Sequence, residues 1–170
     1  MEPLALADLH RATPVGVEVD LSFPARWSLE RVGDVVVGGG FTALAIDEQD
    51  HVVHARRERT LPDTVGAGMR LLVCGLNPSL HAADAGVGFV TPGNRYWPAA
   101  LAARLVSRDR DPRHALLVHS VGMTDLVKRA TARAADLDPG EYRAGWIRLE
   151  HLVRWLTRRG GAPIRALSLA

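Results

Sequence analysis

A short apolar run at residues 71–74, Leu-Leu-Val-Cys, ends abruptly at Gly75 and constrains the fold more than any other feature. A run of this length bounded by a glycine is typical of a strand buried on both faces of a parallel sheet. Pro78 has no amide hydrogen with which to continue a strand ladder. Asn77, just before it, should therefore follow the carboxyl end of the strand, where open α/β sheets bind their ligands.

Strand-like and helix-like segments alternate along the rest of the chain. We expect a helix that begins near residue 95 and ends before 109, a strand over 115–118, a helix over 138–159 and a third strand that begins within 163–170. Asp138 and Pro139 are residue types that favour a helix start. A repeated strand–helix order predicts an α/β fold with a central parallel sheet and right-handed crossovers.

The first sixty residues have a different pattern. Short apolar or alternating runs are separated by glycines and by an acidic cluster, which is typical of a small antiparallel β meander. Its expected strands cover residues 15–21, 34–37, 41–46 and 52–55. A loop with proline and glycine follows over 60–69, so we divide the chain into an N-terminal β extension, 1–60, and an α/β domain, 61–170.

Composition places the chain in an ordinary class. With 170 residues, 47% hydrophobic and 24% charged, it suits one globular unit, and no membrane span or signal segment is visible, so we expect a cytoplasmic protein. The single cysteine, Cys74, excludes a disulfide framework and is expected to be buried and inert. The net charge is +2 and Lys128 is the one lysine, so the positive charge is almost all guanidinium. That is compatible with nucleic-acid binding without identifying it.

The long loop after the first strand leaves several readings open. It has neither P-loop spacing nor a dinucleotide fingerprint. Phe89 could belong to the core or offer a flat face to a stacked base, and Asn77 could cap the strand end or act in catalysis. Asp84 and Asp125 could form an acid/base pair, although Asp125 would also suit a helix N-terminus. The scattered histidines lack metal-ligand spacing, so we expect no metal and no cofactor.

Four blocks of sequence, in one order, resemble a known family. They are Gly75-Leu76-Asn77-Pro78-Ser79, Gly86-Val87-Gly88-Phe89, Pro92-Gly93-Asn94-Arg95-Tyr96-Trp97, and Gly122-Met123-Thr124-Asp125-Leu126-Val127 followed by Arg129 and Thr131. Together they resemble the G:T/U mismatch-specific DNA glycosylases, the group of the bacterial mismatch-specific uracil-DNA glycosylase and thymine-DNA glycosylase. The resemblance covers about residues 71–156.

The resemblance implies a three-layer uracil-DNA-glycosylase-like α/β fold and cofactor-free hydrolysis of the N-glycosidic bond of uracil or thymine. The implied partner is double-stranded DNA with G:U or G:T mispairs. Asn77 would hold the attacking water, Phe89 would stack on the everted base, and backbone amides around Leu76 and Phe89 would bond the base edge. The residues implied to be structural or to contact the DNA backbone are Asn94, Arg95, Ser120 and Arg129.

The chain also departs from that family. The family's Pro-Ser-x-Ser-Gly-Leu-Asn type loop, which wedges into the duplex, is absent, so we expect a fold incomplete at its C-terminus and excision that is strongly reduced or nil. Two alternatives remain. One is a non-catalytic DNA-binding remnant that uses Arg95 and Arg129 on phosphates. The other is an unrelated small-molecule enzyme that uses Asp84 and Asp125.

Overall fold

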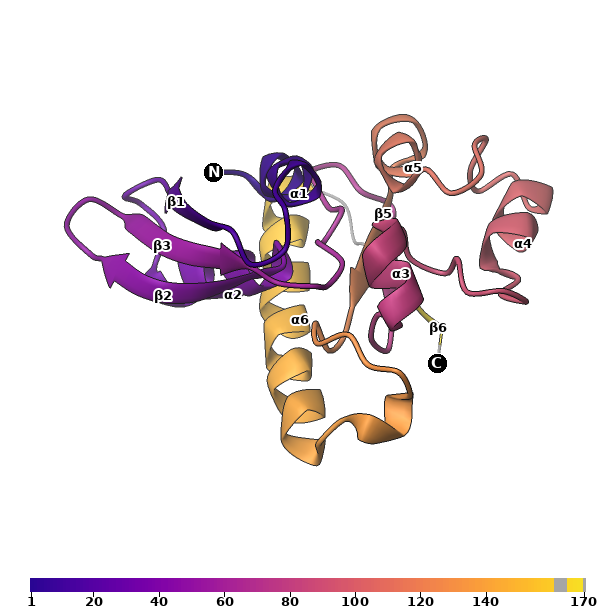
Figure 1. Ribbon diagram of the computed structural model, residues 1–170. Helices are drawn as coiled ribbons and strands as arrows, with labels where there is room; N and C mark the ends of the chain where they lie inside the picture. Colours follow the sequence, from indigo (N-terminus) through magenta and orange to yellow (C-terminus); the bar gives the residue numbers. More distant parts are fainter. Residues whose placement is uncertain (161–164, 170) are drawn as a thin grey trace.

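The computed structural model describes residues 1–160 and 165–169 and has a mixed α/β architecture built on two sheets. The N-terminal sheet is antiparallel, in the order β1 (Glu18–Ser22), β3 (Val52–Arg57), β2 (Phe41–Asp47). The second is parallel, in the order β5 (Val121–Asp125), β4 (Leu71–Gly75), β6 (Arg165–Leu169). The long helix α6 (Pro139–Gly160) lies between them (Figure 1).

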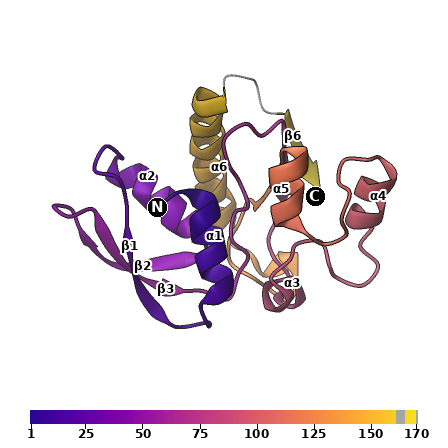
Figure 2. The same cartoon turned by 90° about the horizontal axis from the view of Figure 1, so that it is seen from above.

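The parallel sheet has β4 at its centre. Gly75 is in register with Asp125 on one side and with Leu169 on the other. Three short helices connect β4 to β5, namely α3 (Leu80–Ala85), α4 (Tyr96–Ala102) and α5 (Pro112–His119), whereas α6 connects β5 to β6. Figure 2 shows β6 of this sheet between α6 and α4. The sheet is therefore covered by helices contributed by two separate connections.

Neighbouring residues of β4 face different hydrophobic clusters, as expected for a buried strand. Val73 is fully buried in a cluster with Trp97 of α4 and Val121 of β5. Leu72, also fully buried, packs in a cluster with Leu152 and Leu156 of α6. The prediction of a strand buried on both faces is confirmed, and the buried Cys74 agrees with it.

The N-terminal sheet carries its own core. Helices α1 (Pro3–Ala12) and α2 (Leu29–Gly38) pack with this sheet around Leu21, Val36 and Val53, each at most 1% exposed. Trp155 of α6 packs against both this cluster and the cluster beneath β4. Helix α6 therefore contributes to the cores on both of its sides.

The expected strand at residues 34–37 is wrong, because these residues lie in α2. Their β-branched valines favour strands, but Ser28 caps a helix by accepting a hydrogen bond from the amide of Arg31. Val32, Val35 and Val36 then fall on one buried face at helical spacing. Burial of that face outweighs the weak local strand preference.

The expected strand at residues 115–118 is also wrong. These residues belong to α5, and the parallel strand begins at Val121. Asp111 accepts a hydrogen bond from the amide of His114, and Pro112 occupies the first turn, which is the same start signal that was read correctly at Asp138 and Pro139. Val118 is 60% exposed, so the apolar run was not a buried strand.

The later elements agree better with the sequence. The α6 helix is confirmed, and β6 confirms a third parallel strand over 165–169, while residues 163, 164 and 170 of that expectation lie outside the described residues. Helix α4 ends at Ala102, before the expected end, and α1 and α3 were not predicted. Among the described helices, none has the length and apolar character needed to span a bilayer.

Candidate functional site

The carboxyl edge of the parallel sheet collects the polar residues that the sequence singled out. Asn77 follows β4, and Asp125 is the last residue of β5. In a sheet of this order, the chain leaves the central strand toward one neighbour and returns to the other, and ligands bind at that switch point. The loop that carries Asn77 starts at this point.

The side-chain amide of Asn77 is held by three acceptors. Its Nδ2 donates to the carbonyl oxygen of Arg129 at 3.0 Å, to Thr131 Oγ1 at 2.7 Å and to its neighbour Pro78 at 3.2 Å. These contacts fix the orientation of the half-buried amide. No described residue donates to its Oδ1, so that oxygen remains an acceptor for a water molecule.

Phe89 lies in the same region but in a different environment. Its backbone has a φ of 59°, and its half-buried ring lies 4.6 Å from the ring of Tyr96, centroid to centroid. The ring tip is 3.4 Å from where a β-carbon on Gly75 would lie. Phe89 lines a cavity of about 20 Å³, room for about one water molecule, and Asn77 is not among the lining residues. The structure does not bring Asn77 and Phe89 together around one cavity.

Asp125 lines that small cavity beside Phe89. Burial raises the pKa of Asp125 to about 6, with the nearby carboxylate of Asp63 acting in the same direction and Lys128 and Arg148 opposing it. No hydrogen bond reaches this carboxyl group within the described part of the chain. A buried carboxyl that titrates near neutrality in a cavity is a candidate for proton transfer.

Behind Asp125 lies a buried charge network that sequence reasoning missed. Asp63 accepts from Lys128 Nζ at 2.8 Å and from Arg148 Nη1 at 2.6 Å, and its side chain is 4% exposed. Thr124 Oγ1 also donates to it at 2.6 Å. Burial alone would raise the pKa of Asp63, but the two cations hold it below its usual range. This carboxylate therefore stays ionised while Asp125 titrates.

The burial of Arg148, one member of this network, could have been predicted from the sequence. Arg148 shares a helix face with Gly145, Leu152 and Leu156, all buried, so its guanidinium had to find a buried acid. The burial of Asp63 could not have been predicted in this way, because Asp63 lies in an irregular loop whose burial depends on contacts far away in sequence.

The other predicted residues are distributed around the sheet. Leu76 is half-buried, and its carbonyl oxygen accepts from the amide of Val127. Asn94 and Arg95 are exposed before α4, where Asn94 Oδ1 accepts from the amide of Tyr96. Both can meet a partner from solution.

Ser120 and Arg129 have structural contacts. Ser120 precedes β5, at the opposite, amino edge of the sheet from Asn77, and its carbonyl oxygen accepts from the amides of Arg70 and Leu71. Arg129 forms a bidentate pair with Glu141, both distances 2.7 Å, and donates to the carbonyl oxygen of Asp136 at 2.8 Å. Its guanidinium organises the loop that holds Asn77.

The two acids considered as a pair are in different environments. Asp84 is exposed and accepts both hydrogen bonds of Arg59, at 2.7 and 2.6 Å, which lowers the pKa of Asp84. Asp125 is buried. Within residues 1–160 and 165–169, no cluster of three or more His, Cys, Asp or Glu side chains could hold a metal ion. No model of a known protein family matches the chain.

Proposed function

We propose that this chain is a mismatch-specific uracil/thymine-DNA glycosylase of three-layer α/β type, acting on uracil, or thymine, opposite guanine. The sequence blocks that resemble this family supply the class of reaction. The observation that carries the proposal is the fixed amide of Asn77 at the carboxyl edge of the sheet, with its oxygen open to accept from a water molecule.

The chemistry suits a neutral amide. Asn77 Oδ1 accepts a hydrogen bond from water, whose oxygen then bonds to C1′ of the sugar while the N-glycosidic bond breaks. The base leaves with the bonding electron pair, and the water proton goes to solvent. Since the sugar is cation-like during this step, a placed water suffices and no strong nucleophile is needed.

The everted base needs more space than the structure offers at Phe89. A cavity of about 20 Å³ is too small for a pyrimidine, so the Phe89 loop must move to receive one. The positive φ of Phe89 and the glycines at 86 and 88 support an opening within residues 86–89. We therefore expect slow excision, limited by opening of this loop.

The test is single-turnover cleavage of a G:U duplex with enzyme in excess. We expect slow uracil release that falls at least about tenfold in Asn77→Ala and in Phe89→Ala. Gln49→Ala is the matched control, because it removes an exposed side-chain amide in the turn between β2 and β3, which is not among the residues proposed to contact DNA. It should leave the saturated rate unchanged. Release that is independent of Asn77 in folded protein would refute the proposal.

If no uracil release from a G:U duplex can be detected, a second candidate is favoured, namely a non-catalytic DNA-binding protein. The closed cavity at Phe89 and the exposed Asn94 and Arg95 are the observations that favour it. Such a protein should bind duplex DNA with an affinity that falls steeply with salt, and Arg95→Gln should flatten this dependence. Arg129→Gln should act through the loop instead, since Arg129 is paired with Glu141.

A further inference from the structure

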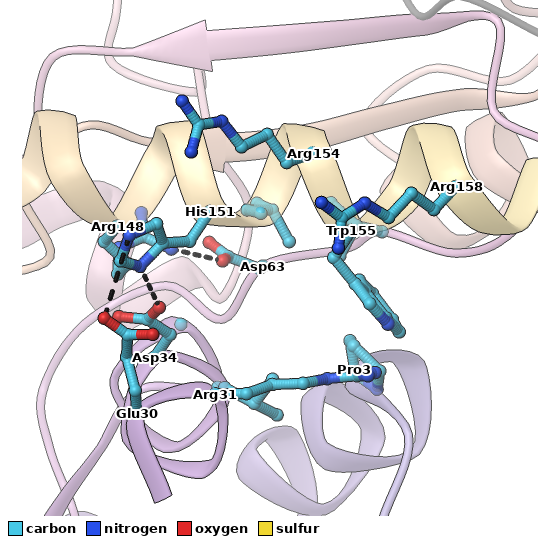
Figure 3. A pocket seen from close by; sticks show the side chains of 15 residues that line it. Pro3, Glu30, Arg31, Asp34, Asp63, Arg148, His151, Arg154, Trp155 and Arg158 are labelled. Atoms are coloured by element: carbon cyan, nitrogen blue, oxygen red, sulfur yellow. Dashed lines mark hydrogen bonds and ion pairs between the residues drawn. The ribbon is translucent and has the colours of Figure 1, made fainter. Parts of the chain in front are cut away.

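A cavity distinct from the carboxyl edge lies between α1, α2 and α6. It has a volume of about 330 Å³, within the range of small-molecule sites although at its lower end. Figure 3 shows side chains of α6 above it and of α2 below it, with Pro3 of α1 at one end. It lies on the α6 side of the structure, whereas Asn77 and Phe89 are in the loops that follow β4.

Among the charged side chains at this cavity, Arg158 is an exposed cation that is available to a ligand. Arg148 is paired with Asp63, and Arg154 is paired with Glu150 at 2.6 Å. His151 contacts Asp34 at 2.8 Å and Glu30 at 3.9 Å. Arg158, exposed at the rim, has no ion pair within the described residues. The guanidinium of Arg158 can therefore bind an anionic group of a ligand without competition from a carboxylate of the described residues.

A flat aromatic surface adjoins that cation. The guanidinium carbon of Arg31 lies 3.6 Å from the ring centroid of Trp27 and 4.2 Å from that of Trp155. Trp155, Arg31 and Arg158 all line the cavity, and Arg158 follows Trp155 by three residues on α6, a spacing that makes side chains neighbours on a helix. Val35, Val65 and Leu152 add apolar lining. A planar ring would find contact here with an indole and a stacked guanidinium.

A buried donor adds a second polar feature. Arg148 is 5% exposed and lines the cavity, and its Nε is buried without a hydrogen-bond partner in the described structure. Unsatisfied buried donors are rare and costly. A ligand oxygen or a water molecule bound in the cavity would satisfy this group.

We propose that this cavity binds a small planar organic anion, a single ring that carries one carboxylate or phosphate group. The ring lies against Trp155 and the apolar lining, and the oxyanion meets Arg158 at the rim. The volume of the cavity limits the ligand to one ring. The guanidinium of Arg158 favours a single negative group, and the indole of Trp155 favours a flat ligand. This site is separate from the proposed glycosylase site and does not depend on it.

Benzoate and phenyl phosphate are the two probes, with neutral benzamide and inorganic phosphate as comparisons. Binding is followed by calorimetry and by quenching of tryptophan fluorescence, which Trp155 makes sensitive to this cavity. We expect saturable binding of one aromatic anion, and the tighter of the two identifies the oxyanion. Benzamide and inorganic phosphate should each bind at least about tenfold more weakly. Equal binding of benzamide, or no binding of either anion at millimolar concentration, would overturn the proposal.

Two exposed arginines of α6 form a matched pair for locating the anion. Arg158→Gln should weaken binding of the preferred anion about tenfold or more, because it removes a charge-assisted contact. Arg143→Gln removes an arginine from the same helix outside the cavity and should leave binding unchanged. Both side chains are exposed, so both variants should fold. Equal affinities of the two variants would place the anion elsewhere.

Discussion

The guanidinium of Arg148 donates to Asp63 Oδ2 at 2.6 Å, and both side chains are almost completely buried, at 6% and 4% exposure. This contact joins α6 to the loop before β4 across 85 residues of sequence. Arg148 Nη2 also donates to the carbonyl oxygen of Asp125 at 2.7 Å. One side chain thus positions both the buried acid and the end of β5.

Replacing Arg148 should therefore destabilise the fold strongly. Arg148→Leu leaves Asp63 buried with Lys128 as its remaining cation, and the expected loss is about 3–5 kcal/mol in the free energy of unfolding. Urea denaturation measures this loss. Arg154→Leu, which removes the exposed pair with Glu150, should cost no more than about 0.5 kcal/mol. Similar losses for both variants would contradict the role of burial.

The contact between His151 and Asp34 should make stability depend on pH. The hydrogen bond with Asp34 raises the pKa of His151. A histidine whose pKa is raised by folding stabilises the fold fully below its unfolded pKa of about 6.5, and this contribution disappears as pH rises through the folded pKa. The stability difference between wild type and Asp34→Asn should thus be larger at pH 6 than at pH 8.

His10 should make stability change with pH in the opposite direction to His151. The effect of His151 is therefore measured as a difference between wild type and Asp34→Asn. Burial, assisted by Arg57, lowers the pKa of His10 to about 3. Its contribution is present above the unfolded pKa and is lost as pH falls toward 3. Because wild type and Asp34→Asn both contain His10, its contribution cancels in the difference between their free energies of unfolding, measured by denaturation at each pH. A difference that does not change between pH 6 and 8 would exclude the His151 contact as a source of pH dependence.

A side chain at Gly75 should destabilise the fold. A β-carbon there would lie 2.4 Å from Asp125 Oδ1 and 3.4 Å from Phe89 Cζ. Because Asp125 is buried, Gly75→Ala should lower the free energy of unfolding by about 1–3 kcal/mol, measured by thermal or urea denaturation.

Gly33 is the matched control for that substitution. It lies within α2, and a β-carbon there would meet no atom within 4 Å. Gly33→Ala should therefore stabilise the protein by about 0.5–1 kcal/mol through helix propensity. A destabilised Gly33→Ala, or an unaffected Gly75→Ala, would mean that the packing around β4 differs from that described.

Cys74 should react with thiol reagents only after unfolding. Burial, with the nearby carboxylate of Asp125, raises the pKa of Cys74 to about 11, so little thiolate exists at pH 8. A chromogenic disulfide reagent should label native protein slowly and label it rapidly in denaturing urea. Fast stoichiometric labelling under native conditions would show that the strand is accessible.

Sequence reasoning succeeded where one local signal was sufficient. The apolar run ending at Gly75 defined β4, and the Asp138–Pro139 start with its apolar stripe defined α6. It failed at residues 115–118, where an apolar run was read as a strand although a helix start preceded it. The partners of Asn77 could not be anticipated, because Arg129 and Thr131 reach it only through the return of the chain after β5.

Trp155 packs against the hydrophobic clusters on both sides of α6. The helix therefore contributes to the core of the N-terminal layer and to that of the parallel-sheet layer. Loss of the N-terminal layer would expose Trp155 and its side of α6 to water, while the other side still covers β4. The two layers should accordingly melt in a single transition, and proteolytic removal of the first sixty residues should leave a remainder that aggregates.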